Sequence, residues 1–154
     1  PAATTHFSWR NGNMSIYKAF EHQHVPEIMQ SLHQLQPGFG GSVDFIPYRG
    51  DFARGIFATE ALTCDVPLEE VEAAYRDFYS EASFTHYVSR PIDLKQVVNT
   101  NKCLIHAEQH GHKLLITSCI DNLLKGASGQ AVQNMNLMFG LEETTGLRLK
   151  PVAF

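Results

Sequence analysis

Several features are scarce in this sequence, and each scarcity excludes a class of protein. The 12 basic residues are scattered and the net charge is −4, so no surface for nucleic acid is expected. No apolar run approaches the roughly 18 residues that a membrane span needs. The three cysteines, Cys64, Cys103 and Cys119, lack C-x-x-C spacing. They therefore favour reduced thiols of a cytoplasmic protein over a disulfide framework or a zinc site.

The composition that remains is that of a globular domain. The chain has 154 residues, of which 44% are hydrophobic and 18% charged, enough for one buried core. Its first residues lack an initiator Met and have neither the basic nor the apolar region of a signal peptide. We therefore expect a single domain over residues 1–154 that is a fragment or a processed chain.

Apolar periodicity and turn residues predict the secondary structure. Val25-Pro26-Glu27 is typical of a helix start, and Ile28, Leu32 and Leu35 give that helix one apolar face. A second helix follows Asp65-Val66-Pro67, with Asp65 a possible cap and with a buried stripe of Val71, Ala74, Tyr75 and Phe78. A third helix covers residues 126–139 and ends at Gly140. Strands are expected at residues 4–9, 42–48, 55–62, 85–89, 95–98, 102–108 and 113–120.

The order of these elements indicates the fold class. Helices interrupt runs of hairpin-like strands instead of alternating with them, and residues 102–108 and 113–120 form the clearest hairpin. This pattern predicts an α+β domain with a mostly antiparallel sheet and helices on one face. The Gly-rich run at residues 37–41 follows a helix and precedes a strand, the reverse of a dinucleotide-binding turn. No complete cofactor site is therefore expected in this chain.

Two histidines precede the first predicted helix. His22 and His24 are one residue apart, and imidazole is suited to proton transfer at neutral pH. Glu27, three residues after His24, lies where it could orient or charge-balance a ring. The alternatives are surface histidines beside a helix cap or a metal chelate, for which His6 and His33 are only loosely available as further ligands.

Two further segments contain candidate binding residues. Arg54 begins a predicted strand, where a guanidinium could bind a carboxylate or phosphate, although a solvated arginine is equally consistent. In the last helix, Gly126, Gly129, Gln133 and Asn136 share one face. Two glycines weaken a helix, so another helix or a ligand should approach closely there; structural packing is the simpler interpretation.

Four ordered blocks resemble N-acetyl-gamma-glutamyl-phosphate reductases and together span nearly the whole chain. His22 to Ile28 resembles that family's H-x-H-x-P-E-I segment, and Phe45 to Ile56 its F-x-P and R-G-I stretch. Val98 to Cys103 resembles its T-N-x-C segment, in which the cysteine is not the nucleophile. Asp121 to Asn136 is similar to its C-terminal helix.

The resemblance implies a cytoplasmic enzyme of arginine biosynthesis. Such enzymes reduce N-acetyl-glutamyl 5-phosphate with NADPH and release phosphate, and a cysteine thiolate attacks the acyl phosphate. Their fold resembles glyceraldehyde-3-phosphate and aspartate-semialdehyde dehydrogenases, with a nucleotide-binding domain before an α+β domain that pairs subunits into a homodimer or homotetramer. The nucleophile lies in a G-C-Y-type segment, and most of the NADP site lies further upstream; neither occurs in this chain.

By matching position, the resemblance also assigns residues. His24 is the expected catalytic acid/base, with His22, Glu27 and Arg54 binding or supporting the small-molecule substrate. Gly129, Gln133 and Asn136 are expected to face the cofactor, on a helix (residues 126–140) that packs toward the missing domain. The fragment alone should be inactive. Alternatives are a sibling reductase acting on an aspartyl or aminoadipyl phosphate, and a self-associating assembly module.

Overall fold

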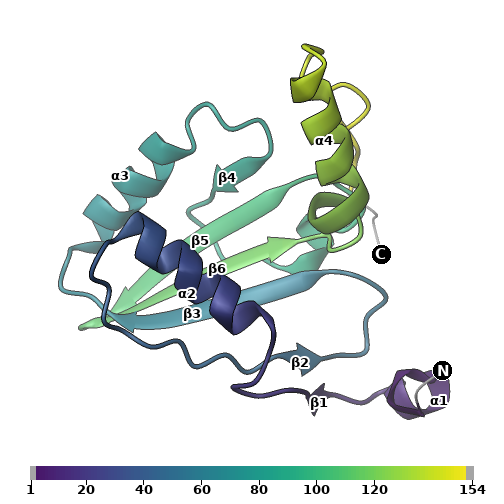
Figure 1. Cartoon of the computed structure of the whole chain (residues 1–154), viewed down its shortest axis with the longest axis horizontal. Coiled ribbons are helices and arrows are strands. Elements are labelled where there is room, and N and C mark those ends of the chain that lie inside the picture. Colours follow the sequence, from purple (N-terminus) through teal and green to yellow (C-terminus); the bar gives the residue numbers. More distant parts are fainter. Residues whose placement is uncertain (1–2, 152–154) are drawn as a thin grey trace. The chain divides into compact units, whose positions relative to one another are not determined.

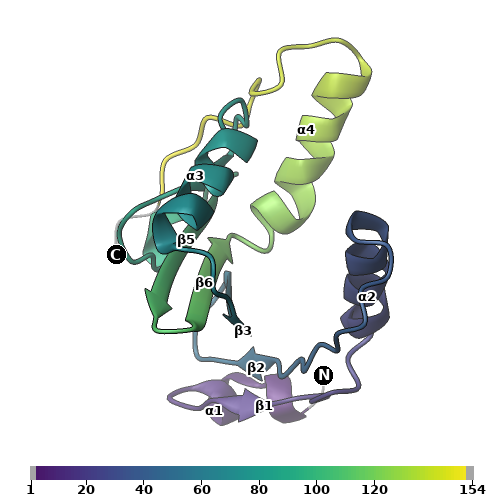
Figure 2. The same ribbon diagram turned by 90° about the vertical axis from the view of Figure 1, so that its left-hand side faces the viewer.

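The computed structural model describes residues 3–151. These residues form two compact units, and the chain passes from the first to the second between Ala53 and Arg54. Figures 1 and 2 show the elements of both units from two directions. Among the described residues, no helix is long and apolar enough to cross a membrane.

The first unit consists of short elements. It contains the 3-10 helix η1 (Ala3–Thr5), α1 (Phe7–Arg10), β1 (Ser15–Ile16), α2 (His24–Leu35) and β2 (Tyr48–Arg49). β1 and β2 pair antiparallel, with Ser15 opposite Arg49. The strand predicted at residues 4–9 is wrong, because η1 and α1 occupy that segment. The strand predicted at residues 42–48 is also largely wrong, because only Tyr48 of that range lies in a strand, β2.

Arg10 joins the ends of this first unit. Its guanidinium donates to the carbonyl oxygens of Thr4 at 2.8 Å and of Arg49 at 2.9 Å. A second link comes from the Asp51 carboxylate, which accepts the Gly12 N–H at 2.6 Å. Hydrogen bonds between side chains and backbone therefore connect distant segments of this unit.

The predicted first helix is confirmed as α2. Its apolar residues occur at the expected spacing, but no residue of the helix is buried, and Leu35 is 83% exposed. Periodicity identified the helix correctly because spacing depends on helical geometry and not on what covers the apolar face.

The second unit is built on a four-stranded mixed sheet in the order β3-β6-β5-β4 (Figure 1). β4 (Thr85–Tyr87) runs parallel to β5, and the other pairs are antiparallel. β5 and β6 form the predicted hairpin around a two-residue turn at Gly111 and His112, where Gly111 has a φ of +59°. The α+β class and the mostly antiparallel sheet are confirmed. The remaining strands are β3 (Ile56–Thr63), β5 (Cys103–His110) and β6 (Lys113–Ile120).

The two faces of this sheet have different covers. α3 (Leu68–Phe78) contacts β4 and β5 and packs over a cluster that contains Tyr87, Ile105 and Leu114. On the opposite face, Leu104 and Cys119 pack against the segment between β4 and β5. The strand predicted at residues 95–98 is wrong, because the 3-10 helix η2 (Leu94–Gln96) and a turn occupy this segment.

The buried stripe of α3 is rotated from its prediction. Leu68, Val71, Tyr75 and Tyr79 pack toward the sheet, whereas Phe78 is 79% exposed. Asp65 does not cap the helix; its carboxylate contacts the His112 ring at 2.5 Å. Glu69 and Glu70 lie in the first turn, next to the positive end of the helix dipole.

The last helix follows β6 at the end of the sheet, as Figures 1 and 2 show. A π-helical turn, η3 (Leu124–Ser128), leads directly into α4 (Gly129–Met138). Gly140, with a φ of +66°, follows the helix end as the sequence predicts. The predicted helix start at residue 126 therefore falls inside η3.

Candidate functional site

His22 and His24 differ in their surroundings, although they are one residue apart. The ring of His22 is partly buried and packs edge-on against Tyr17 at 5.5 Å and His24 at 4.5 Å, and tilted against Phe45 at 5.3 Å, measured between centroids. Its Nδ1 accepts the backbone N–H of His24 at 3.2 Å. His22 is therefore held in one orientation, with Nδ1 as an acceptor.

His24 is the first residue of α2 and is exposed. Its ring contacts His22 and, at 6.4 Å, Phe45, and neither ring nitrogen has a hydrogen-bond partner among residues 3–151. A ring fixed by aromatic contacts with both nitrogens open can exchange a proton with a bound molecule.

Burial and nearby charges lower the pKa of His22. Burial lowers its pKa, the neighbouring His24 and Lys18 lower it further, and Glu27 opposes them. Lys18 and Phe20 both have positive φ, at 46° and 63°, an uncommon conformation for residues other than glycine. The segment before the histidines is therefore strained, and the Phe20 N–H is tied to the Phe45 carbonyl at 2.8 Å.

Arg54 lies at the start of the second unit, next to β3. Its Nε is 3.1 Å from Oδ2 of Asp121, without the alignment of a hydrogen bond. Its side chain is 29% exposed, whereas that of Asp121 is fully buried. The guanidinium thus has an internal counter-ion, which the sequence did not reveal because 67 residues separate the two.

The three residues expected on the cofactor side are all engaged within the domain. Gln133 accepts from Asn101 Nδ2 at 3.1 Å and from Lys125 Nζ at 2.9 Å, and donates to Glu143 at 2.6 Å. Asn136 is 1% exposed and donates to the carbonyl oxygens of residues 143 and 145. A cofactor contact at these positions stays a prediction.

Gly129 is required by packing at this place. A Cβ on it would lie 2.2 Å from Oδ1 of Asn101 and 3.0 Å from the backbone of Leu124. The close approach expected of a glycine on this face is therefore made by Asn101, a buried residue of the T-N-x-C segment whose role the sequence did not indicate.

The glutamate of this network is held ionised. Glu143 accepts from Ser83 Oγ at 2.6 Å and from Gln133 Nε2 at 2.6 Å. These two hydrogen bonds lower the pKa of Glu143, and Lys125 lowers it further. The network therefore fixes the segment after α4 to the loop before β4.

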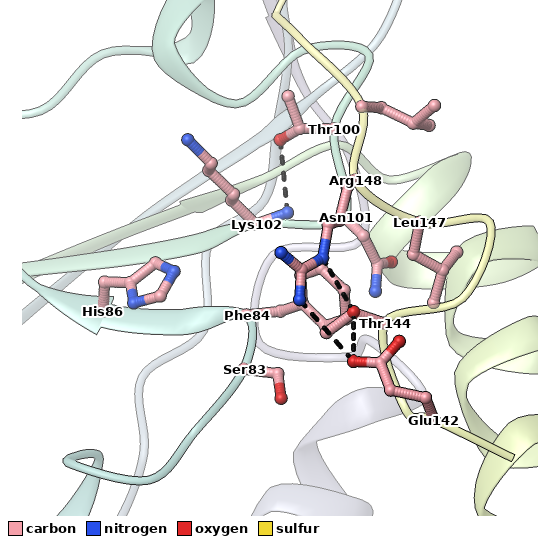
Figure 3. A pocket seen from close by; sticks show the side chains of 11 residues that line it. Ser83, Phe84, His86, Thr100, Asn101, Lys102, Glu142, Thr144, Leu147 and Arg148 are labelled. Atoms are coloured by element: carbon pink, nitrogen blue, oxygen red, sulfur yellow. Dashed lines mark hydrogen bonds and ion pairs between the residues drawn. The ribbon is translucent and has the colours of Figure 1, made fainter.

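A pocket of about 470 Å³ adjoins this network in the second unit (Figure 3). Arg148 lies beside Glu142 and Thr144, whereas the Lys102 side chain points away from them. Burial and the nearby Lys102 lower the pKa of His86. The pocket contains none of the predicted site residues. Its lining is formed by Ser83, Phe84, His86, Thr100, Asn101, Lys102, Glu142, Thr144, Leu147, Arg148 and Leu149.

Among the described residues no group of three or more metal-binding side chains comes together. His6 and His33, considered as further ligands, have other contacts: His6 accepts the Ser8 N–H at 3.3 Å, and the His33 ring lies 3.1 Å from the Phe39 carbonyl. Cys103 and Cys119 are not activated either. Burial raises the pKa of Cys103, and burial raises that of Cys119 to about 11.

The fold and the sequence motifs agree with one protein family. Residues 1–122 match the family described as semialdehyde dehydrogenase, dimerisation domain. The chain belongs to this family. Self-association is the property that the family description states.

Individual relatives of known name are also similar in sequence to the chain. The chain is 73% identical over all 154 residues to an N-acetyl-gamma-glutamyl-phosphate reductase of Phocaeicola vulgatus and covers 48% of that protein. It is 61% identical over 154 residues to one of Parabacteroides distasonis, covering 48% of it. It is 62% identical over 151 residues, 98% of the chain, to one of Flavobacterium johnsoniae, covering 46% of it. The chain thus spans about half the length of these relatives.

Proposed function

We propose that this domain is the substrate-binding and proton-transferring half of an N-acetyl-gamma-glutamyl-phosphate reductase. The observation that carries the proposal is the histidine pair at the start of α2, in which His22 is held and the ring nitrogens of His24 are open. The names of relatives at 61–73% identity support the same activity.

The proposed reaction converts N-acetyl-glutamyl 5-phosphate, NADPH and a proton into the 5-semialdehyde, phosphate and NADP. It serves arginine biosynthesis in the cytoplasm. The nucleophilic cysteine and most of the NADP site belong to the half of the protein outside this chain. Cys103 and Cys119 do not replace that nucleophile, because burial raises the pKa of both and keeps them as thiols.

His24 acts as the acid/base in this proposal. The oxygen of the reacting carbonyl needs a proton as the aldehyde precursor forms and loses it when the aldehyde is released. An imidazole with an open nitrogen can supply and recover that proton. His22 supports it: its ring packs on His24, and its Nδ1 accepts the His24 N–H. Glu27 balances their charge from the first turn of α2.

The cofactor supplies the hydride, and its contacts with this domain are limited. The polar side chains of Gln133 and Asn136 are used within the domain, and the space beside Gly129 holds Asn101. These three residues do not fit a cofactor cradle by themselves. We therefore assign α4 to the interface with the missing half, where its exposed Met138 and Phe139, at 80% and 74%, need a cover.

The proposed assembly is a homodimer or homotetramer formed through the sheet. The face of β3 that carries Phe57 lies opposite the α3-covered face, and Phe57 is 41% exposed. A second subunit on this face would bury it. Light scattering of the 154-residue chain tests this, and a monomer at high concentration contradicts it.

The activity is tested in the full-length protein. We expect NADPH oxidation with N-acetyl-glutamyl phosphate, and a His24→Asn variant should lower kcat by about 10²- to 10⁴-fold. His33→Asn, on the same helix but bonded to a backbone carbonyl, is the matched control and should keep full activity. Normal turnover of His24→Asn removes the acid/base role. Preference for aspartyl or aminoadipyl phosphate would replace the proposed substrate with a sibling one.

A further inference from the structure

A buried carboxylate lies at the end of β6, where the chain turns into η3. Asp121 is fully buried, and its Oδ1 accepts the N–H groups of Leu123 at 2.8 Å and Leu124 at 3.0 Å. Its Oδ2 accepts the N–H of Asn99 at 2.7 Å. Asn99 has a φ of +66°, which turns that N–H toward the carboxylate. Asp121 is therefore fixed from three sides by backbone donors.

The fourth neighbour of this carboxylate is Arg54. Its Nε lies 3.1 Å from Oδ2. The backbone beside Arg54 is also held, because the Gly55 N–H donates to the Asn122 side chain at 2.6 Å. Neither Nη group donates a hydrogen bond to any of residues 3–151.

This one-sided contact leaves the outer edge of the guanidinium open. A guanidinium presents parallel N–H pairs along its edges, and the pair formed by Nη1 and Nη2 matches two oxygens of a carboxylate or phosphate. An arginine that only neutralised a buried carboxylate would bind it most strongly with two nitrogens, through two parallel hydrogen bonds. Here Nε faces the acid, and the side chain keeps 29% of its surface exposed.

We infer that Asp121 is a positioning residue, which holds Arg54 so that its Nη edge binds an oxyanion of the substrate. The inference rests on the proposed function, whose substrate has two such groups, the acyl phosphate and the α-carboxylate. Arg54 touches the substrate, and Asp121 acts through Arg54.

The first test separates positioning from simple charge neutralisation. In the full-length enzyme, Arg54→Lys keeps a cation for Asp121 but loses the Nη edge. We expect KM for the acyl phosphate to rise by about 10- to 100-fold, as for the loss of hydrogen bonds to a charged group, while kcat and the melting temperature stay near wild type. An unchanged KM would overturn the inference.

Chemical rescue tests the role of Asp121 directly. Arg54→Ala leaves a buried carboxylate beside an empty guanidinium site, so added guanidinium should restore activity with saturation. The double variant Arg54→Ala, Asp121→Asn should show no rescue. Because Asp121→Asn places an amide against backbone donors, a melt of each variant accompanies the assay. Absence of rescue in the folded Arg54→Ala enzyme would also contradict the inference.

The reverse reaction distinguishes the two oxyanions, because phosphate and semialdehyde then enter as separate substrates. Arg54→Lys should raise KM for phosphate alone if the edge binds the phosphoryl group, and KM for the semialdehyde alone if it binds the carboxylate. An effect on neither overturns the inference. Calorimetric titration of the full-length protein with inorganic phosphate and with acetate does not depend on turnover. If the enzyme proves inactive but Arg54→Lys still weakens binding of one probe, the proposed function fails and the inference stands.

Discussion

The two units of this chain differ in how they are stabilised. In the unit that begins at Arg54, eleven hydrophobic residues are buried, several of them in clusters on both faces of the sheet. In residues 3–53 no residue is buried, and polar backbone contacts join short elements. Yet the first unit carries the histidines of the proposed reaction. The residues proposed to handle substrate therefore lie in the unit whose side chains are least buried.

The largest expected difference between the units is the effect of removing apolar side-chain volume. Ile105 is 7% exposed and belongs to the cluster beneath α3. Ile105→Ala should lower the free energy of unfolding by about 2–5 kcal/mol. Ile28→Ala, in the partly exposed stripe of α2, should cost less than about 1 kcal/mol in the same chain.

Urea unfolding of the 154-residue chain measures both changes. Equal losses of unfolding free energy in the two variants would contradict the difference between the units. They would mean that the apolar stripe of α2 is as well packed as the sheet.

A smaller contrast lies within the second unit, between two glycines three residues apart. A Cβ at Gly129 meets Asn101 Oδ1 at 2.2 Å and backbone at 3.0 Å, whereas a Cβ at Gly126 meets its nearest atom, in Ile120, at 3.5 Å. Gly129→Ala should therefore destabilise the chain by about 1–3 kcal/mol through overpacking. Gly126→Ala should be neutral or stabilising by up to about 1 kcal/mol, because alanine favours helical backbone.

Thermal melts of the two variants decide this point. A stable Gly129→Ala would show that Asn101 can move aside and that packing does not require glycine there. The cofactor would then become the better explanation of that residue.

The units also differ in how far the sequence predicted them. In the second unit β3, the β5–β6 hairpin and α3 were predicted nearly to their ends. The periodicity of the hairpin reflects burial, whereas most residues of β3 are exposed and that strand is held by its pairing with β6. α3 packs only partly buried side chains against the sheet. In the first unit the segments at residues 4–9 and 42–48 look like strands, but they lack enough partners to form a sheet. Local alternation alone cannot supply cross-strand hydrogen bonds.

Site prediction had a similar limit. His22 and His24 are close in sequence, and their ring contact follows from that spacing. The partner of Arg54 could not be found in this way, because Asp121 is brought to it by the pairing of Ile56 with Ile120. The bonds of Gln133 to Asn101 and Glu143 likewise depend on tertiary structure.

The smallest expected contrast is in the response to pH. In the second unit Tyr87 donates to Glu72 at 2.8 Å, and burial, followed by this hydrogen bond, raises the pKa of Tyr87 from 10.0 to about 12. The folded state favours the protonated phenol, so its stabilising contribution is complete below pH 10 and is lost between pH 10 and about 12. In the first unit the lowered pKa of His22 favours the neutral ring, so that contribution is lost as pH falls below 6.5.

Unfolding midpoints measured from pH 5 to 12 test this opposition. Alkali should weaken the second unit first, and Tyr87→Phe should flatten the loss above pH 10 because it removes the titrating group. Glu72→Gln keeps an acceptor but removes the negative charge, so it should bring the pKa of Tyr87 closer to 10. The loss of stability above pH 10 should then be smaller than in the wild type. An alkaline loss that is identical in wild type and Tyr87→Phe would assign it to other groups, such as Tyr75, whose pKa burial also raises.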